Sequence, residues 1–332
     1  MSVATAPREQ GWLVGHEAAE AALVADARAE RLHHAWLITG PQGIGKATLA
    51  FRFARWMLAG RPAGGLDVPE DHPVFRRVAA ATHADLLAIG RSYDEKRQRF
   101  RGEIVADDVR PIGDFLRRTA AEGGWRVVVL DDADLLNRHA ANALLKILEE
   151  PPARAVLILV SSAPGRLLPT IRSRCRALRL APLGLPQMMV VLERLLPDHD
   201  EPARRRLALL AHGAPGQALA LAGEDGIAMD GLVRMLLEDG AGAGGRAYEL
   251  ADRILRRDQG FSTFLSLLAD AISGRVRGEA RAGGPGPATG PASGTDWMAV
   301  WHEIRRVQAE TERFNLDKRQ ALLSSLSLLS ER

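Results

Sequence analysis

The sequence predicts an α/β fold: a parallel sheet that carries a phosphate-binding loop, followed by helices to the end of the chain. The loop, GPQGIGKAT at residues 40–48, lies between a short apolar run and an apolar pattern of helical spacing. Two further apolar runs, 127–130 and 155–160, have a helix-like segment between them. Alternating strands and helices are typical of a parallel sheet covered on both faces.

The neighbours of the phosphate-binding loop support it. The run Ala35–Thr39 predicts a strand that ends at the first glycine, and Leu49, Phe53 and Met57 predict the helix that follows. In such a loop, glycine backbone N–H groups approach phosphate oxygens and a lysine supplies positive charge. The residues in these positions are Gly40, Gly43, Gly45 and Lys46.

The residue after the loop lysine departs from the pattern. That position normally holds a hydroxyl that ligates Mg²⁺, and here it is Ala47. Thr48 is no simple substitute, because one step along a helix turns the side chain by about 100°. The sequence therefore predicts an ATPase fold whose nucleotide site is impaired. A glycine-rich turn in a generic α/β protein is the alternative.

A second part of the same site follows the predicted strand Val127–Leu130. A carboxylate at the carboxyl end of a parallel strand beside a phosphate loop normally holds Mg²⁺, and Asp131 stands there. Asp132 occupies the position of a water-polarising Glu and is one methylene shorter. The alternative is an acidic turn that caps the next helix through Asn137 or Asp134, and both interpretations can hold together.

The next elements are a helix over residues 141–148, which a proline pair ends, and the buried strand 155–160. The basic turn 171–176 follows, and by itself it is typical of a solvated loop.

Three strings of residues together resemble a known family. They are GPQGIGK, VVVLDDADLLNRHAANALLKILEEPP and LVSSAPGRLLPTIRSRC. They resemble the clamp-loader branch of the AAA+ ATPases, as found in bacterial DNA polymerase III; the similarity begins near Leu13, is clear to about Leu180 and continues weakly to the C-terminus. By this resemblance Arg174, in Ser-Arg-Cys, is an arginine finger that acts in trans on ATP held by a neighbouring subunit.

Three positions differ from the ATP-hydrolysing members of this family. Ala47 lacks the hydroxyl, Asp132 replaces Glu, and Gly216 stands where the lid domain usually has a second sensing arginine. Ser161 or Ser162 falls at the position of the first sensor Thr. The resemblance thus implies a non-hydrolysing subunit that donates a finger, and binding of ATP or ADP with weak or absent Mg²⁺ dependence stays open. The alternatives are an autonomous AAA+ ATPase, either an ATP-hydrolysing subunit of the tau/gamma type or a stand-alone DNA-processing machine, and, less favoured, a small-molecule P-loop kinase.

The resemblance also implies partners. They are tau/gamma and delta-type clamp-loader subunits and, through the complex, the sliding clamp and primed DNA during replication. The chain would then be a subunit of the DNA polymerase holoenzyme and of its clamp-loader ATPase, and not catalytic alone. The charged segment 91–103 could contact DNA phosphates, although a solvated loop is the favoured interpretation.

No metal site is expected. Many members of the family carry a cysteine zinc module after the loop helix, but residues 58–83 contain no cysteine. His72 and His83 alone make a poor zinc site. The one cysteine of the chain, Cys175, also excludes an internal disulfide.

The resemblance and the helical periodicity after residue 180 predict three domains. They are an AAA+ P-loop domain over 1–180, a small helical lid domain over 181–225 and a helical collar domain over 226–332. Helical periodicity is present in Met188–Leu196, Arg204–Leu210, Leu232–Leu237, Tyr248–Leu255, Phe261–Ile272 and Trp297–Leu329. The Gly/Pro-rich segment at about 275–295 predicts a flexible loop, and Phe314–Asp317 is expected to open a long helix.

Composition places few limits on function. The formal net charge of +3 is too small to indicate nucleic acid by itself, in spite of a pI of 9.4. No apolar stretch reaches the length of a membrane span, and the N-terminus lacks a signal-peptide core. We therefore expect a soluble, cytoplasmic protein without a membrane partner.

Overall fold

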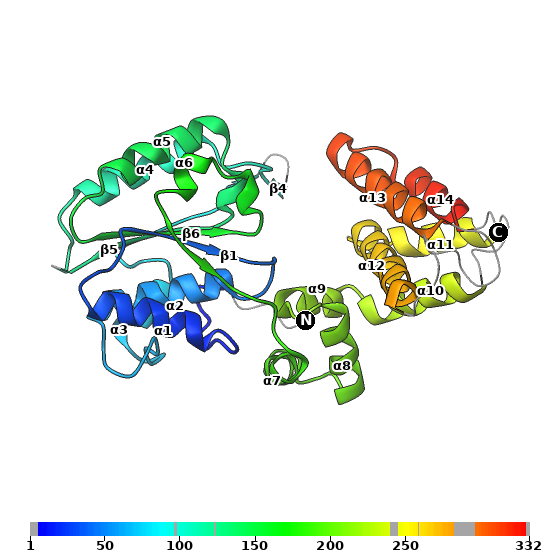
Figure 1. Cartoon of the computed structure of the whole chain (residues 1–332), viewed down its shortest axis with the longest axis horizontal. Coiled ribbons are helices and arrows are strands. Elements are labelled where there is room, and N and C mark those ends of the chain that lie inside the picture. Colours follow the sequence, from blue (N-terminus) through cyan, green and yellow to red (C-terminus); the bar gives the residue numbers. More distant parts are fainter. Residues whose placement is uncertain are drawn as a thin grey trace. The chain divides into compact units, whose positions relative to one another are not determined.

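The structure is a computed structural model that describes residues 6–95, 98–122, 124–239, 245–257, 259–281 and 296–329 (Figure 1). The chain forms two compact units. The first comprises Met1–Pro197 with His212–Gln217, and the second comprises Asp198–Ala211 with Ala218–Arg332. The three predicted domain boundaries stay a prediction.

A five-stranded parallel sheet forms the centre of the first unit. Its strand order is β2-β5-β6-β1-β7, with β1 Ala35–Thr39, β2 Leu86–Ile89, β5 Arg126–Leu130, β6 Ala155–Ser161 and β7 Arg176–Arg179. Every residue of β1, β5 and β6 is buried. Apart from Arg126, Thr39 and Ser161 at their ends, these strands are apolar runs, because helices cover both faces of the sheet. The predicted α/β fold with a parallel sheet is confirmed.

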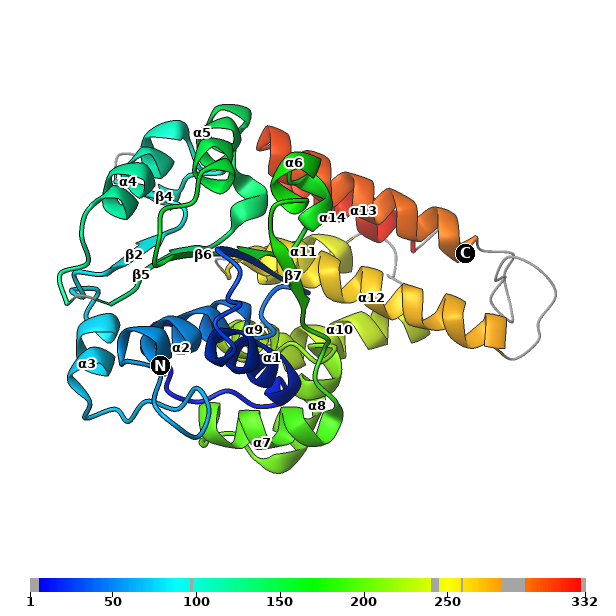
Figure 2. The same cartoon turned by 60° about the vertical axis from the view of Figure 1, so that its left-hand side comes forward.

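Helices cover both faces of this sheet, as Figures 1 and 2 show. One face carries α1 Glu17–Arg28, α2 Lys46–Leu58 and α3 Pro73–Ala79, and the other carries α4 Ala106–Arg117, α5 Arg138–Glu149 and α6 Pro169–Arg172. Two separate apolar clusters result, one around Phe53 and Trp56 and one around Ile112 and Leu144. The first unit also contains α7 Leu185–Leu195.

The sheet brings the ends of its strands to one edge. Because β1, β5 and β6 run parallel, the segments that follow Thr39, Leu130 and Ser161 meet there. Short pieces complete this edge: the strands β3 Tyr93–Asp94 and β4 Arg99–Phe100, and the 3₁₀ turns Ala133–Leu135 and Pro164–Arg166. The predicted loop and both predicted acidic residues are therefore at the carboxyl edge of the sheet.

The second unit is helical in its described residues. It contains α8 Glu201–Leu210, most of α9 Pro215–Gly223, α10 Gly226–Asp239, α11 Gly245–Leu255, α12 Gly260–Arg281, α13 Trp297–Phe314 and α14 Lys318–Ser327. Its core includes Phe264, Leu268, Ile304 and Leu322. No helix of the described residues is long and apolar enough to cross a membrane.

Two expectations for this helical region are wrong. Helix α12 continues to Arg281, so the predicted flexible loop does not begin at 275; residues 282–295 lie outside the described part of the chain. Phe314 ends α13 and opens no long helix. Asn315 adopts a left-handed conformation (φ 53°) and ends α13, and the Asp317 side chain then caps the ten-residue helix α14.

Candidate functional site

The phosphate-binding loop depends on glycine at each predicted position. Gly40, Gly43 and Gly45 have φ of 148°, 81° and 101°, in a region that disfavours residues with a side chain. A Cβ on Gly40 would also lie 2.6 Å from the carbonyl oxygen of Leu180. The sequence therefore folds this turn only with these glycines.

Lys46 begins α2, and its ammonium group is turned into the loop. Nζ donates hydrogen bonds to the carbonyl oxygen of Pro41 (2.7 Å) and to Oγ of Ser162 (2.9 Å). Burial lowers the pKa of Lys46, against the opposing charges of Asp131, Asp134 and Asp132. The Ser162 backbone N–H in turn donates to Asp134 Oδ1 (2.9 Å). Of the two serines predicted for the sensor position, Ser162 is the one that contacts the lysine.

Ala47 and Thr48 lie in the first turn of α2, where both are partly buried. Ala47 follows Lys46 directly, so the position that would present a hydroxyl to a metal has only a methyl group.

The two acidic residues after β5 have different environments. Asp131 accepts a hydrogen bond at Oδ1 from the backbone N–H of Asp132 (2.9 Å). Burial, together with the charge of Asp132, raises the pKa of Asp131, while Lys46 and Arg91 oppose this shift. Asp132 has a left-handed backbone (φ 50°), and its Oδ2 accepts from Nε of Arg91 (2.9 Å).

The alternative for this turn, an acidic helix cap, holds in part. The Asn137 side chain accepts from the backbone N–H of Ala140 (2.9 Å) and so caps α5, whereas Asp134 bonds Ser162 instead. Asn137 is the N-cap that was predicted as one of two choices. Sequence reasoning missed Arg91, although its place directly after β2 puts it at the same sheet edge.

Gly216 contacts the loop itself. Its backbone N–H donates to the carbonyl oxygen of Gly43 (2.8 Å), and a Cβ on Gly216 would lie 2.9 Å from Gly43 Cα. No side chain fits there unless the backbone moves. The absence of arginine at this position thus has a physical reason, since the start of α9 lies directly on the phosphate loop.

Arg174 lies at the other edge of the sheet. It comes two residues before β7, whose Arg176 pairs with Trp36, whereas the phosphate loop follows Thr39, which pairs with Arg179. Three residue steps along a strand span about 10 Å, so Arg174 and Lys46 are on opposite edges. The structure does not bring them together.

The Arg174 guanidinium is half-exposed and held within the chain. NH2 forms an ion pair with Glu149 Oε1 (2.9 Å), and NH1 donates to the carbonyl oxygen of Thr170 (3.1 Å). The neighbouring Cys175 is an unreactive thiol at neutral pH, because burial raises its pKa to about 12.

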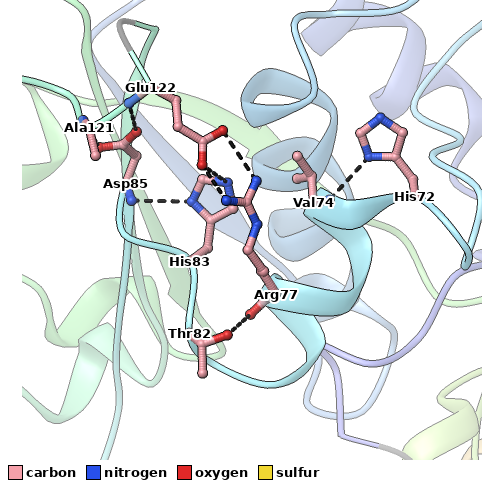
Figure 3. A network of polar contacts seen from close by, with 8 residues as sticks. All are labelled: His72, Val74, Arg77, Thr82, His83, Asp85, Ala121 and Glu122. Carbon is pink, nitrogen blue, oxygen red and sulfur yellow. Dashed lines mark hydrogen bonds and ion pairs between the residues drawn. The ribbon is translucent and has the colours of Figure 1, made fainter.

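The two histidines considered for a metal have separate roles, as Figure 3 shows. His72 caps α3 by accepting from the backbone N–H of Val74 (3.2 Å). His83 accepts at Nδ1 from the backbone N–H of Asp85 (3.2 Å), and its Nε2 faces Oε1 of Glu122 at 3.9 Å. In the part of the chain that the structure describes, no three His, Cys, Asp or Glu residues gather as metal ligands.

Comparison with known proteins gives a consistent picture. The family model described as "DNA polymerase III, delta subunit" matches residues 15–184. DNA polymerase III subunit delta' of Pseudomonas aeruginosa is 41% identical over 58% of this chain and 56% of its own length. The delta' subunit of Escherichia coli is 37% identical over 60% and 57%.

The same comparison reaches a second type of subunit. DNA polymerase III subunit tau of Escherichia coli is 30% identical over 67% of this chain and 33% of its own length. The chain thus spans a little over half the length of the delta' relatives that it matches. Because the family model covers half of the chain, the chain belongs to this family of DNA polymerase III delta-type subunits, is similar to delta' and is related to tau.

Proposed function

We propose that the chain is a delta'-like subunit of the DNA polymerase III clamp loader. It hydrolyses no ATP itself, supplies Arg174 to ATP held by a neighbouring subunit, and helps to place the sliding clamp on primed DNA. Its partners are tau/gamma and delta-type subunits in the cytoplasm. The names of the relatives support membership of the DNA polymerase III complex. The arrangement of this chain's own residues supports the role of supplying Arg174 in place of hydrolysing ATP.

The observation that carries this proposal is the separation of the two candidate chemical groups. Arg174 lies at the edge of the sheet opposite Lys46, so it cannot act on a nucleotide held by its own loop. A half-exposed guanidinium can instead reach a phosphate of another chain once it leaves the Glu149 carboxylate. Such a contact stabilises the charge that develops on a transferring phosphoryl group, which is worth about 10³–10⁵ in rate.

The phosphate loop itself favours binding without turnover. Phosphate oxygens fit the loop amides and Lys46, whose Nζ would exchange Pro41 and Ser162 for the ligand. Mg²⁺ fits less well, because Ala47 offers no oxygen and only the buried Asp131 remains beside the loop. Asp132 is engaged with Arg91 and so is poorly placed to orient water. An ATP-hydrolysing subunit of the tau/gamma type therefore remains the less favoured alternative.

The experiment compares two arginine variants in a reconstituted complex of the four kinds of component: this chain, tau/gamma, delta and clamp. Arg174→Ala is expected to abolish most of the DNA-stimulated ATP hydrolysis, whereas the complex still assembles. Arg172→Ala is the matched control, since Arg172 is exposed on the same turn. Turnover that is the same in both variants and in the unmodified complex refutes the role of Arg174.

A further inference from the structure

A short hairpin leaves the sheet beside the acidic pair. After β2, the chain forms β3 and β4, in which Tyr93 pairs with Phe100. The Arg101 backbone N–H donates to the carbonyl oxygen of Ser92 (2.9 Å) and closes the base of the hairpin. The Asp131 backbone N–H donates to the carbonyl oxygen of Ile89 (2.8 Å) and holds the end of β2 next to the acidic residues. The hairpin is thus fixed at the sheet edge that carries the phosphate loop.

Two aromatic side chains on this hairpin are exposed to solvent. Tyr93 is 51% exposed and Phe100 is 57% exposed. Their ring centroids are 5.3 Å apart, and the rings meet edge to face at 79°. Folding usually buries such side chains, since each carries a large apolar area. An exposed aromatic pair therefore indicates a surface that binds a flat or apolar ligand.

An arginine is held against one of these rings. Arg91 Nε donates to Asp132 Oδ2 (2.9 Å), and Arg91 Cζ lies 5.6 Å from the Phe100 ring centroid. Asp132 thereby has a use that differs from water activation: it holds a guanidinium over an aromatic face.

The charge of the segment identifies the kind of ligand. Residues 91–103 contain five Lys or Arg and three Asp or Glu, a net charge of +2. Arg101, beside Phe100, is exposed. Aromatic rings interleaved with positive charge suit a polyanion whose flat groups can stack, and unpaired nucleic-acid bases provide both features. Bases within a duplex do not, because their faces are already stacked.

We propose that Tyr93 and Phe100, with Arg91, form a stacking site for unpaired bases of single-stranded DNA. The site adds a direct DNA contact to the proposed function. It depends neither on the finger role of Arg174 nor on nucleotide binding.

The experiment measures binding of the full chain to two fluorescently labelled strands of equal length, oligothymidine and its abasic counterpart. Wild type is expected to bind oligothymidine more tightly. The double variant Tyr93→Ala/Phe100→Ala should lose about tenfold in affinity for oligothymidine, because each stacked base contributes substantially, and should bind the abasic strand as before. The double variant Tyr93→Phe/Phe100→Tyr keeps both rings and should retain the wild-type affinity.

Phe314→Ala is the matched control. Phe314 is also exposed, at 60%, and Arg313 Cζ lies 5.1 Å from its ring centroid, but it is in the helical unit. Equal affinity of wild type for the two strands, unchanged binding by the alanine double variant, or no binding of oligothymidine overturns the proposal. Because the assay contains no ATP and no other subunit, its failure leaves the Arg174 proposal untouched.

Discussion

A methyl group at position 216 tests the contact between the start of α9 and the phosphate loop. Gly216→Ala would place Cβ 2.9 Å from Gly43 Cα and 3.2 Å from the Gly43 carbonyl oxygen. Both atoms belong to the backbone of a turn with φ of 81°, so they cannot rotate away as a side chain would. The loop or the start of α9 must shift, and the hydrogen bond from Gly216 N–H to Gly43 weakens.

The expected cost follows from three contributions. Overpacking costs about 1–3 kcal/mol, and a weakened hydrogen bond adds up to about 1 kcal/mol. Alanine in place of glycine in a helix returns about 1 kcal/mol. We therefore expect Gly216→Ala to lower the free energy of unfolding of the first unit by up to about 3 kcal/mol. Gly216→Arg, which places a much larger side chain at the same position, should lower it further.

Urea unfolding followed by tryptophan fluorescence suits this test. The first unit contains four of the six tryptophans, Trp12, Trp36, Trp56 and Trp125, so the signal reports mainly on it. Gly231→Ala is the control: Gly231 lies within α10, and a Cβ there would have nothing within 4 Å. That variant should be neutral or more stable by up to about 1 kcal/mol. If Gly216→Ala is as stable as Gly231→Ala, the described contact does not constrain the loop.

Two further outcomes are expected. Burial lowers the pKa of His83 below 6.5, so the folded state favours the neutral ring. The contribution of His83 to the free energy of unfolding is therefore fully present above pH 6.5. It falls as the pH drops below 6.5, because the unfolded chain takes up the proton first. His83→Asn should reduce this pH dependence by at most about 1.4 kcal/mol per pH unit, measured by urea unfolding between pH 5 and 8; a slope equal to that of the wild type would contradict the reasoning. In equilibrium titrations of the purified chain with a fluorescent ATP analogue, removal of Mg²⁺ should change the affinity by less than roughly threefold, because Ala47 supplies no metal ligand; a strong Mg²⁺ dependence would favour the hydrolysing alternative.

The sheet and the loop were predictable because their patterns are local. Residues 35–38 and 127–130 are apolar runs with buried side chains throughout, and the loop glycines require backbone conformations that few residues adopt. The N-cap Asn137 follows the same logic, since a side-chain amide at a helix start satisfies a free N–H group. Each of these features is determined by residues that are close together in the sequence.

The contacts that distinguish this site were not predictable, because they join distant segments. Nothing near Asp132 in the sequence indicates Arg91, and nothing near Gly43 indicates Gly216. The sheet register brings these partners together. The prediction for the helical region was wrong for a different reason. Gly274 and Gly278 weaken helical propensity by about 1 kcal/mol each, and this cost does not end α12, which continues through both.

Two of the three departures from a hydrolysing site, Gly216 and Asp132, make contacts with other segments of this chain. Gly216 allows the start of α9 to contact Gly43, and Asp132 accepts a hydrogen bond from Arg91. Lys46 meanwhile bonds Ser162. Lys46 and Asp132, which a hydrolysing site would direct at the nucleotide, thus form hydrogen bonds within the chain instead. With a hydroxyl at position 47, Asp132 would still be paired with Arg91, and position 216 would still hold a glycine. We therefore propose that this chain lacks turnover because of the whole arrangement and not because of one substitution, and we expect a single reversion to leave the other two obstacles in place.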